Sequence, residues 1–151
     1  MTPARAVVGF DVRRVDDHVE VDPLVDGVSL GDAMDLDLAG IWVVDEAGAD
    51  RMSDRLLGRG SVWGRSGLAV LQVCGCGVED DDLLAAEVVV SDDHVEWRDL
   101  QQQTEPPLTH AAVGPFSFDR VAYERAVGRA HDDVVALVGR DRSTRQDAGG
   151  A

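Results

Sequence analysis

The sequence predicts a single α+β domain, an antiparallel sheet of about five to seven strands with a C-terminal helix packed on one face. Short apolar runs separated by acidic turns indicate the strands, and one long amphipathic segment near the C-terminus indicates the helix. A length of 151 residues suits one domain, which we place at residues 1–140, with a disordered tail at 141–151.

The stretch from Leu68 to Leu100 predicts the centre of the sheet. An apolar run reaches a Cys-Gly-Cys-Gly corner, crosses the acidic turn V-E-D-D-D, and returns as two strand-like runs that reverse at Asp92-Asp93. Runs of this length bounded by turn residues are typical of strands. We therefore expect three consecutive antiparallel strands here.

A second hairpin is predicted from Ala6 to Val21, reversing at Asp16-Asp17. Pro23 is expected to end its pairing, because proline has no N–H to donate to a neighbouring strand. Short strands are expected at 25–30 and 40–45. The pentapeptide Asp-Asp-His-Val-Glu stands at both predicted reversals, at 16–20 and at 92–96. Either a shared turn chemistry or a duplicated hairpin would explain that identity.

The remaining segments are predicted as loops and helices. A helical turn is expected from Met52 to Leu57, with Ser53 as its cap, followed by a glycine-rich loop. A polar loop is expected at 101–113. The strongest helix spans 119–139, with Asp119 as N-cap, a Phe118–Tyr123 hydrophobic staple and Gly139 as its stop. One face of it carries Tyr123, Val127, Ala130, Val134 and Leu137, and we expect Tyr123, Val127 and Val134 to be buried.

Composition excludes several functions. The chain contains no lysine, so it lacks the amine that P-loop phosphate binding and Schiff-base catalysis require. Its net charge is −15, and no arginine-rich stretch interleaved with aromatics is present, which disfavours nucleic acid and anionic membranes as partners. With no membrane-length apolar run and no secretion signal at the start, we expect a cytoplasmic protein.

Two sets of residues could carry chemistry. Cys74 and Cys76, with His94 or Asp81, could approximate a zinc site, although structural zinc sites take four ligands, commonly from paired C-x₂₋₄-C motifs. The alternative, which we expect, is two free thiols that bind no metal and no cofactor.

His18-x-Glu20 and His94-x-Glu96 each place an imidazole and a carboxylate on one strand face. Paired hairpins could unite them in a metal or acid–base site. The alternative is that all four side chains form the solvent-facing side of amphipathic strands. Trp63 and Trp97 are expected to anchor the core.

At several of these residues the sequence resembles a bacterial family of uncharacterised proteins. Members carry a leucine-glycine turn, a run like L-L-G-C-G-C-G-x-x-G-C-W-P-L, then V-x-W-x-D-F, then G-P-F-x-F-D-x-x-x-Y. The matching stretches are 56–58, 74–77, 95–99 and 114–123, in the same order. This chain has Asp81 where those proteins carry a third cysteine. The resemblance implies no established activity.

The acidity suggests a function in protein recognition. We expect a non-enzymatic interaction protein that binds a basic protein partner, in an immunity-like or antitoxin-like role by analogy. The expected contact residues are Asp16, Asp17, Asp80, Asp81 and Asp82. The turns at 79–82 and 92–93 should lie at opposite ends of the sheet, so we expect a patch that combines one of them with 16–17 or 132–133. The alternative is a small metal-binding protein or enzyme that uses Cys74 and Cys76 with a nearby histidine.

Overall fold

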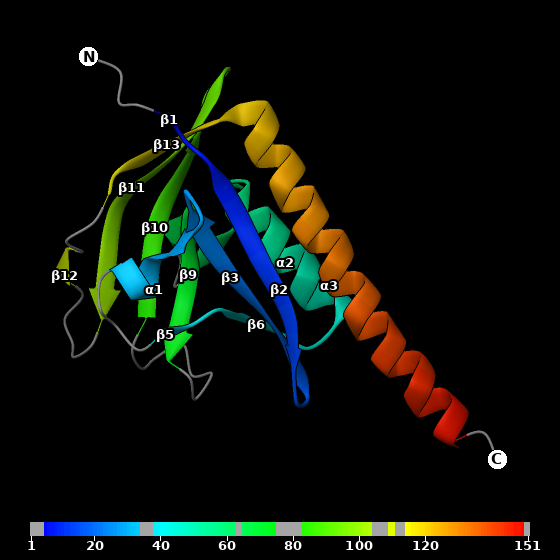
Figure 1. Cartoon of the computed structure of the whole chain (residues 1–151). Helices are drawn as coiled ribbons and strands as arrows, with labels where there is room; N and C mark the ends of the chain where they lie inside the picture. Colours follow the sequence, from blue (N-terminus) through cyan, green and yellow to red (C-terminus); the bar gives the residue numbers. More distant parts are fainter. Residues whose placement is uncertain are drawn as a thin grey trace.

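The computed structural model describes residues 5–33, 38–62, 65–74, 83–103, 109–110 and 114–149. The α+β class is confirmed, with the C-terminal helix packed against β-sheet (Figure 1). Our prediction that all the strands belong to one sheet is wrong. Within the described residues the strands form a seven-stranded sheet, a four-stranded sheet and a two-stranded hairpin.

The larger sheet contains the three central strands, β9 (Leu68–Cys74), β10 (Leu83–Val90) and β11 (His94–Gln103). They pair antiparallel in sequence order, and Val90 faces Val95 across the reversal at Asp92-Asp93, so this part of the prediction is confirmed. The sheet continues with β5 (Leu38–Ala39) beside β9, and with β12 (Thr109–His110) and β13 (Phe116–Asp119) beside β11; β1 (Arg5–Ala6) pairs parallel to β13.

The smaller sheet is built on the first hairpin, β2 (Val8–Val15) and β3 (His18–Val25), which turns at Asp16-Asp17 as predicted. Pro23 does not end the pairing, because β3 continues to Val25. Its second edge shows why: β6 (Ile41–Val43) pairs with 19–21 and β4 (Val28–Ser29) with 24–25. Pro23 falls in the gap between these two partners, where that edge needs no N–H donor.

Two short corners carry the chain from one sheet to the other. Val7 separates β1 from β2, and the Asp26 side chain accepts a hydrogen bond from the Val7 N–H at 2.8 Å. Gly40 separates β5 from β6, and a Cβ at Gly40 would lie 2.5 Å from the Val21 carbonyl oxygen. Only glycine allows the backbone to pass so close to β3. The two sheets are thereby held together at both edges.

The helices are α1 (Leu30–Ala33), α2 (Glu46–Leu56) and α3 (Arg120–Gly149), and a hairpin of β7 (Ser61–Val62) and β8 (Arg65–Ser66) follows α2. α2 begins earlier than predicted: Asp45, not Ser53, is its N-cap and accepts a 2.7 Å hydrogen bond from the Gly48 N–H. Among the described helices, none combines the length and the apolar character needed to cross a membrane.

Helix α3 starts as predicted and ends later. The Asp119 carboxylate caps it by accepting from the Ala122 N–H at 3.0 Å, and the rings of Phe118 and Tyr123 lie 5.5 Å apart, which confirms the staple. The predicted stop at Gly139 is wrong, since the helix continues to Gly149 through most of the segment that we predicted as a disordered tail.

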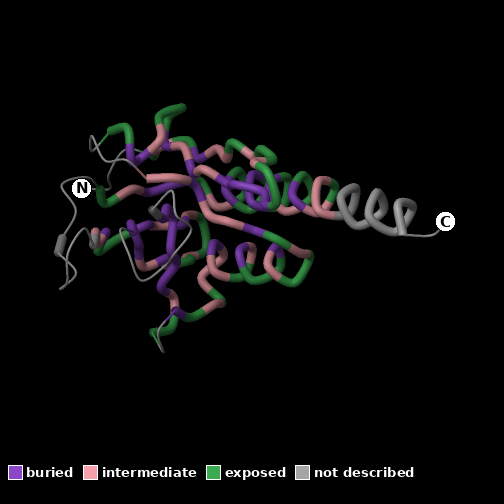
Figure 2. Tube along the Cα trace, turned by 90° about the horizontal axis from the view of Figure 1, so that it is seen from below, coloured by how far each residue is buried: buried purple, intermediate pink, exposed green. Residues whose placement is uncertain are grey.

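The main core lies between the larger sheet on one side and the smaller sheet, α2 and α3 on the other (Figure 2). Tyr123 joins three of these elements. The Trp97 indole N–H donates to the Tyr123 hydroxyl at 2.9 Å, and that hydroxyl donates to the Leu56 carbonyl at 2.6 Å. Tyr123, Val127, Val134 and Trp97 are fully buried, as predicted, and burial raises the pKa of the Tyr123 hydroxyl.

Candidate functional site

The candidate zinc site is not assembled around His94. β9 and β11 both pair with β10, which places Cys74 at the end of the sheet near Leu83 and His94 at the opposite end near Val90. Cys76 and Asp81 lie outside the described residues, as does Trp63. No group of three or more metal-ligating side chains occurs in the part of the chain that the structure describes. Free thiols at Cys74 and Cys76 stay a prediction.

The two His-x-Glu pairs lie in different sheets and do not meet. The His94 ring lies against its neighbour Asp93, with Nδ1 and Oδ1 2.8 Å apart. The prediction that both pairs face solvent is wrong for the first. The His18 and Glu20 side chains are only 5% and 9% exposed, and His18 Nε2 lies 3.3 Å from Glu20 Oε1.

Trp42 of β6 explains this burial. It is the cross-strand neighbour of Glu20, and its indole stacks on the His18 ring with centroids 3.6 Å apart and planes 16° apart. Glu20 Oε2 also accepts from Arg13 at 3.3 Å. A buried carboxylate is tolerated when charged and hydrogen-bonding partners replace water, so this cluster is a structural unit of the smaller sheet.

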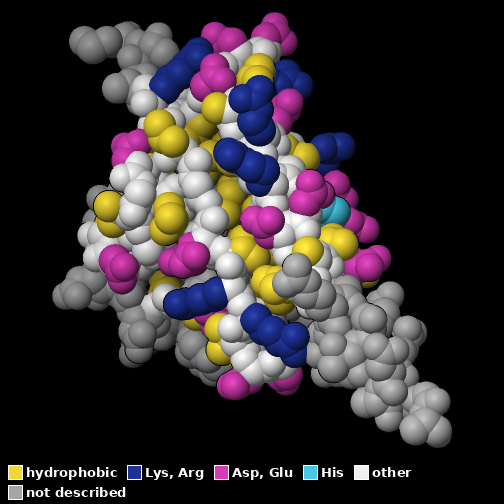
Figure 3. All heavy atoms as spheres, turned by 45° about the vertical axis from the view of Figure 1, so that its right-hand side comes forward, with side chains coloured by type: hydrophobic (Ala, Val, Ile, Leu, Met, Phe, Trp, Pro, Cys, Tyr) yellow, Lys and Arg dark blue, Asp and Glu magenta, His cyan; other side chains and the backbone are white. Residues whose placement is uncertain are grey.

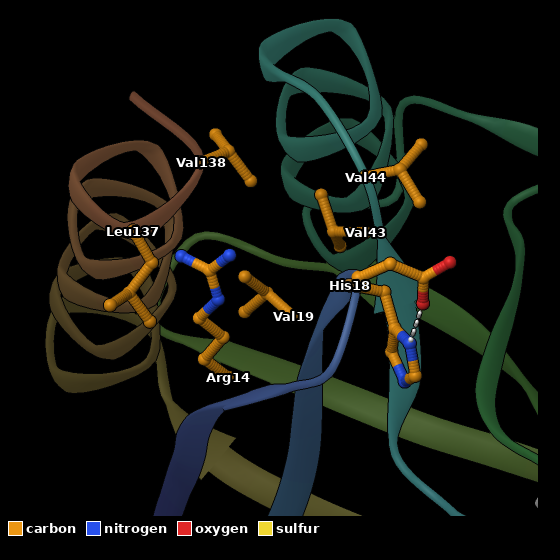
Figure 4. Close-up of a pocket in the computed structure, with 8 residues that line it drawn as sticks. Arg14, His18, Val19, Val43, Val44, Leu137 and Val138 are labelled. Carbon is orange, nitrogen blue, oxygen red and sulfur yellow. Dashed lines mark hydrogen bonds and ion pairs between the residues drawn. The ribbon is translucent and has the colours of Figure 1, made fainter. Parts of the chain in front are cut away.

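The tip of the first hairpin packs against α3 at Leu137 and Val138. Figure 4 shows Arg14 and Val19 directed toward Leu137, with the His18 ring on the other side of the strand. The hollow that these side chains enclose has a volume of about 10 Å³. That is room for about one water molecule, so this place cannot hold a ligand.

A second polar cluster lies between β3 and β9. The buried Gln72 side chain donates through Nε2 to Asp22 at 2.6 Å and to Ser29 at 2.9 Å. Burial raises the pKa of the Asp22 carboxyl, an effect that the hydrogen bonds from Gln72 and Ser29 oppose. These hydrogen bonds join β3, β4 and β9, which is typical of a structural network, and the buried Gln72 Oε1 accepts from no described atom.

The groove between α2 and α3 gathers acidic side chains. The helices run antiparallel, because Leu56 meets Tyr123 and Asp50 meets His131. Asp50, Asp54 and Asp132 are exposed and line the groove. His131 lies between two of them, with Nε2 2.7 Å from Asp50 and Nδ1 3.7 Å from Asp132. On this side of the molecule, acidic side chains surround a histidine (Figure 3).

Gly128 forms part of the lining of this groove. A Cβ at Gly128 would meet nothing within 4 Å, so the missing side chain leaves the groove open. With Ser53 beside it, the groove has a volume of about 410 Å³. Its polar atoms are mainly carboxylate and hydroxyl oxygens, which accept hydrogen bonds and attract cations. The groove can therefore receive a guanidinium or ammonium group.

The predicted contact residues are only partly placed. Asp16 and Asp17 are exposed at the first hairpin tip, beside the α3 segment one to two turns beyond Asp132. Asp80, Asp81 and Asp82 lie outside the described residues. The strand ends at Cys74 and Leu83 lie at the opposite end of the sheet from the Asp92-Asp93 reversal.

Sequence reasoning missed Asp50 and Asp54. The start of α2 was predicted too late in the chain. Asp45 is a good N-cap residue, and a helix that begins after it places Asp50 and Asp54 four residues apart on one face. Their meeting with Asp132 depends on the packing of α2 against α3, which no local pattern shows.

No protein-family model, curated protein or solved structure matches this chain.

Proposed function

We propose that the protein is a cytoplasmic, non-enzymatic interaction protein that binds a basic protein partner in the groove between α2 and α3. The observation that carries the proposal is the convergence of Asp50, Asp54 and Asp132 on an open groove, with His131 as the one cationic type of side chain in its described lining. An immunity-like or antitoxin-like role would suit such a surface by analogy.

The charge distribution supports this function. The chain carries 29 acidic residues against 14 arginines, so its field attracts a basic protein from a distance. Asp16 and Asp17, at the hairpin tip beside Leu137 and Val138 of α3, extend the acidic surface along that helix. Complementary charges of this kind mainly raise the association rate and select the partner.

The open space at Gly128 supports a specific docking mode. Glycine inside a helix costs about 1 kcal/mol relative to alanine, and no described atom would lie within 4 Å of a Cβ placed at Gly128. An arginine or lysine of the partner, seated over Gly128, would reach Asp50, Asp54 and Asp132. The partner should therefore present a projecting basic side chain.

The test is affinity capture from the native host with identification of bound proteins by mass spectrometry. Three forms are compared: the natural chain, a groove variant with Asp50→Asn, Asp54→Asn and Asp132→Asn, and a control with Asp11→Asn, Asp32→Asn and Asp92→Asn. All six aspartates are exposed, so both variants lose the same surface charge. We expect a basic protein that binds the natural chain and the control but not the groove variant.

Kinetics with the captured protein sharpen the test. The screening length falls from about 30 Å at 0.01 M salt to about 10 Å at 0.1 M, so the association rate should fall steeply over that range. Gly128→Gln, which fills the groove without changing charge, should weaken binding, and Asp16→Asn with Asp17→Asn should slow association. Equal capture by groove variant and control, or binding indifferent to salt, would contradict the proposal.

A further inference from the structure

A neighbouring face of α2 lines a basic pocket. α2, β6 and β9 enclose a volume of about 260 Å³, with Arg51 and Arg55 on one wall and Trp42 and Val70 on the other. Residues four apart lie on one helix face, so Arg51 and Arg55 stand together, rotated by one residue from Asp50 and Asp54. The helix thus turns its acidic side to α3 and its basic side to β6.

The charge balance of this pocket is unusual for the protein. Acidic residues outnumber arginines by 29 to 14 over the chain, yet no aspartate or glutamate is among the described residues that line the pocket. Arg51 makes no ion pair with any described residue, and its guanidinium comes close to Gly48, where an added Cβ would lie 3.7 Å from Arg51 Nη2. A guanidinium in this setting offers donors to a ligand.

A second donor, on Trp42, belongs to the facing wall. The Trp42 Nε1–H is buried, and no described atom accepts a hydrogen bond from it. Such donors are rare in folded proteins and cost free energy. The stack on His18 holds the ring in place. Indole and guanidinium N–H groups only donate hydrogen bonds, so both walls of the pocket call for a ligand that accepts them.

We propose that this pocket binds a small molecule through an oxyanion group, a carboxylate or a phosphate, paired with Arg51 and Arg55 beside Trp42. The Arg51 guanidinium can form paired hydrogen bonds to such an anion, and Arg55 adds a second positive charge beside it. Met52 and Leu56 give the floor an apolar character, which suits a short uncharged remainder of the ligand. The site is separate from the acidic groove, so its test is independent of the basic partner.

Calorimetry on the full chain with three probes tests the site: inorganic phosphate, butanoate, and butanamide as the uncharged counterpart of butanoate. We expect saturable binding of at least one anion with a dissociation constant below about 20 mM, and none of butanamide. Phosphate binding alone would identify a phosphate ligand, and butanoate binding a carboxylate ligand. Failure of both anions, or equal binding of butanamide, overturns the proposal.

Variants locate the binding. Arg51→Gln and Arg55→Gln should each weaken the anion by about tenfold, because a hydrogen bond to a charged group is lost. Arg98→Gln removes an exposed arginine elsewhere and should leave the affinity unchanged. Nitrogen-15 spectra, with Trp42→Phe to assign the indole signal, should show the Trp42 N–H shifting as anion is added. Thermal unfolding shows whether each variant is folded. If Arg55→Gln is unstable, the affinity of Arg51→Gln by itself decides the test. Equal losses in all three arginine variants would mean non-specific attraction and would overturn the site.

Discussion

The same five residues, Asp-Asp-His-Val-Glu, form both 16–20 and 92–96, and the two copies end in different environments. Both reverse an antiparallel pair at the two aspartates, and both turn their valine, Val19 or Val95, into the core. In both, the histidine Nδ1 lies near the preceding aspartate, at 3.2 Å for His18 and 2.8 Å for His94. The inward valine and the contact of the histidine with its preceding aspartate are therefore shared, but the turn backbone is not, because φ is 50° at Asp16 and positive at neither Asp92 nor Asp93.

The difference lies on the outer face of each hairpin. The His18 side chain is 5% exposed and that of His94 is 31% exposed. The cross-strand neighbour of Glu20 is Trp42, whereas that of Glu96 is Ser117. A tryptophan covers its neighbours and a serine cannot, so one pair is enclosed and the other stays half-exposed. Local sequence places the reversal, and the neighbouring strand decides the burial.

Trp42→Ala should break this comparison with the largest effect. Removing the indole exposes His18 and Glu20 and removes contacts with the core beside Val70. We expect a loss of about 2–3 kcal/mol in the free energy of unfolding, below the range for a fully buried tryptophan because Trp42 is half-buried. Urea unfolding measures it. A loss under about 0.5 kcal/mol would show that Trp42 is not what stabilises this hairpin.

A matched pair of substitutions compares the hairpins directly. His18→Ala should cost about 1–2 kcal/mol, because the stack on Trp42 is lost and the enclosed Glu20 loses a partner. His94→Ala removes a partly exposed side chain that lies against its exposed neighbour Asp93, and should cost less than about 0.5 kcal/mol. Both values come from the same urea titrations. Equal costs would mean that the different burial has no energetic consequence.

Asp22, two residues beyond Glu20 on β3, tests burial of a carboxyl group by its pH dependence. Burial raises its pKa above the ordinary value of 3.8, so the group favours the folded state most below that value and loses this contribution as pH rises through the folded pKa. Asp22→Asn keeps an acceptor for Gln72 and removes the charge. The variant should gain stability relative to the natural chain as pH rises from 3 toward neutral, measured by thermal unfolding across about four pH values. A relative loss over this interval would reverse the sign we assign.

Asp93 should show the smallest effect, with the opposite sign. The hydrogen bond to His94, and next that to Arg5, hold the pKa of the Asp93 carboxyl below its usual range. Its contribution to stability is therefore present above the ordinary value of 3.8 and is lost as pH falls through the folded pKa. His94→Ala should raise the Asp93 pKa, as followed by carbon-13 spectra of the carboxyl group. An unchanged value would show that His94 does not lower it.

Much of the secondary structure followed from local patterns. Alternating valines and paired aspartates predicted both hairpins, and Asp119 with Phe118 and Tyr123 predicted the start of α3. Pro23 was misjudged because its effect depends on where β4 and β6 end along β3. Gly139 was misjudged because glycine only weakens a helix and need not end it.

By itself, the sequence determined the reversals, the inward valines and the capped start of α3, because turn chemistry, strand alternation and capping act over a few residues. Only the tertiary structure decided that Trp42 encloses His18 and Glu20, that Asp50 and Asp54 meet Asp132, and that Arg51 and Arg55 face Trp42. Each of these meetings joins strands and helices that are distant in the chain. The burial of a side chain and the clustering of charges depend on which strand or helix packs against it. That packing is determined by the core as a whole and not by the local sequence.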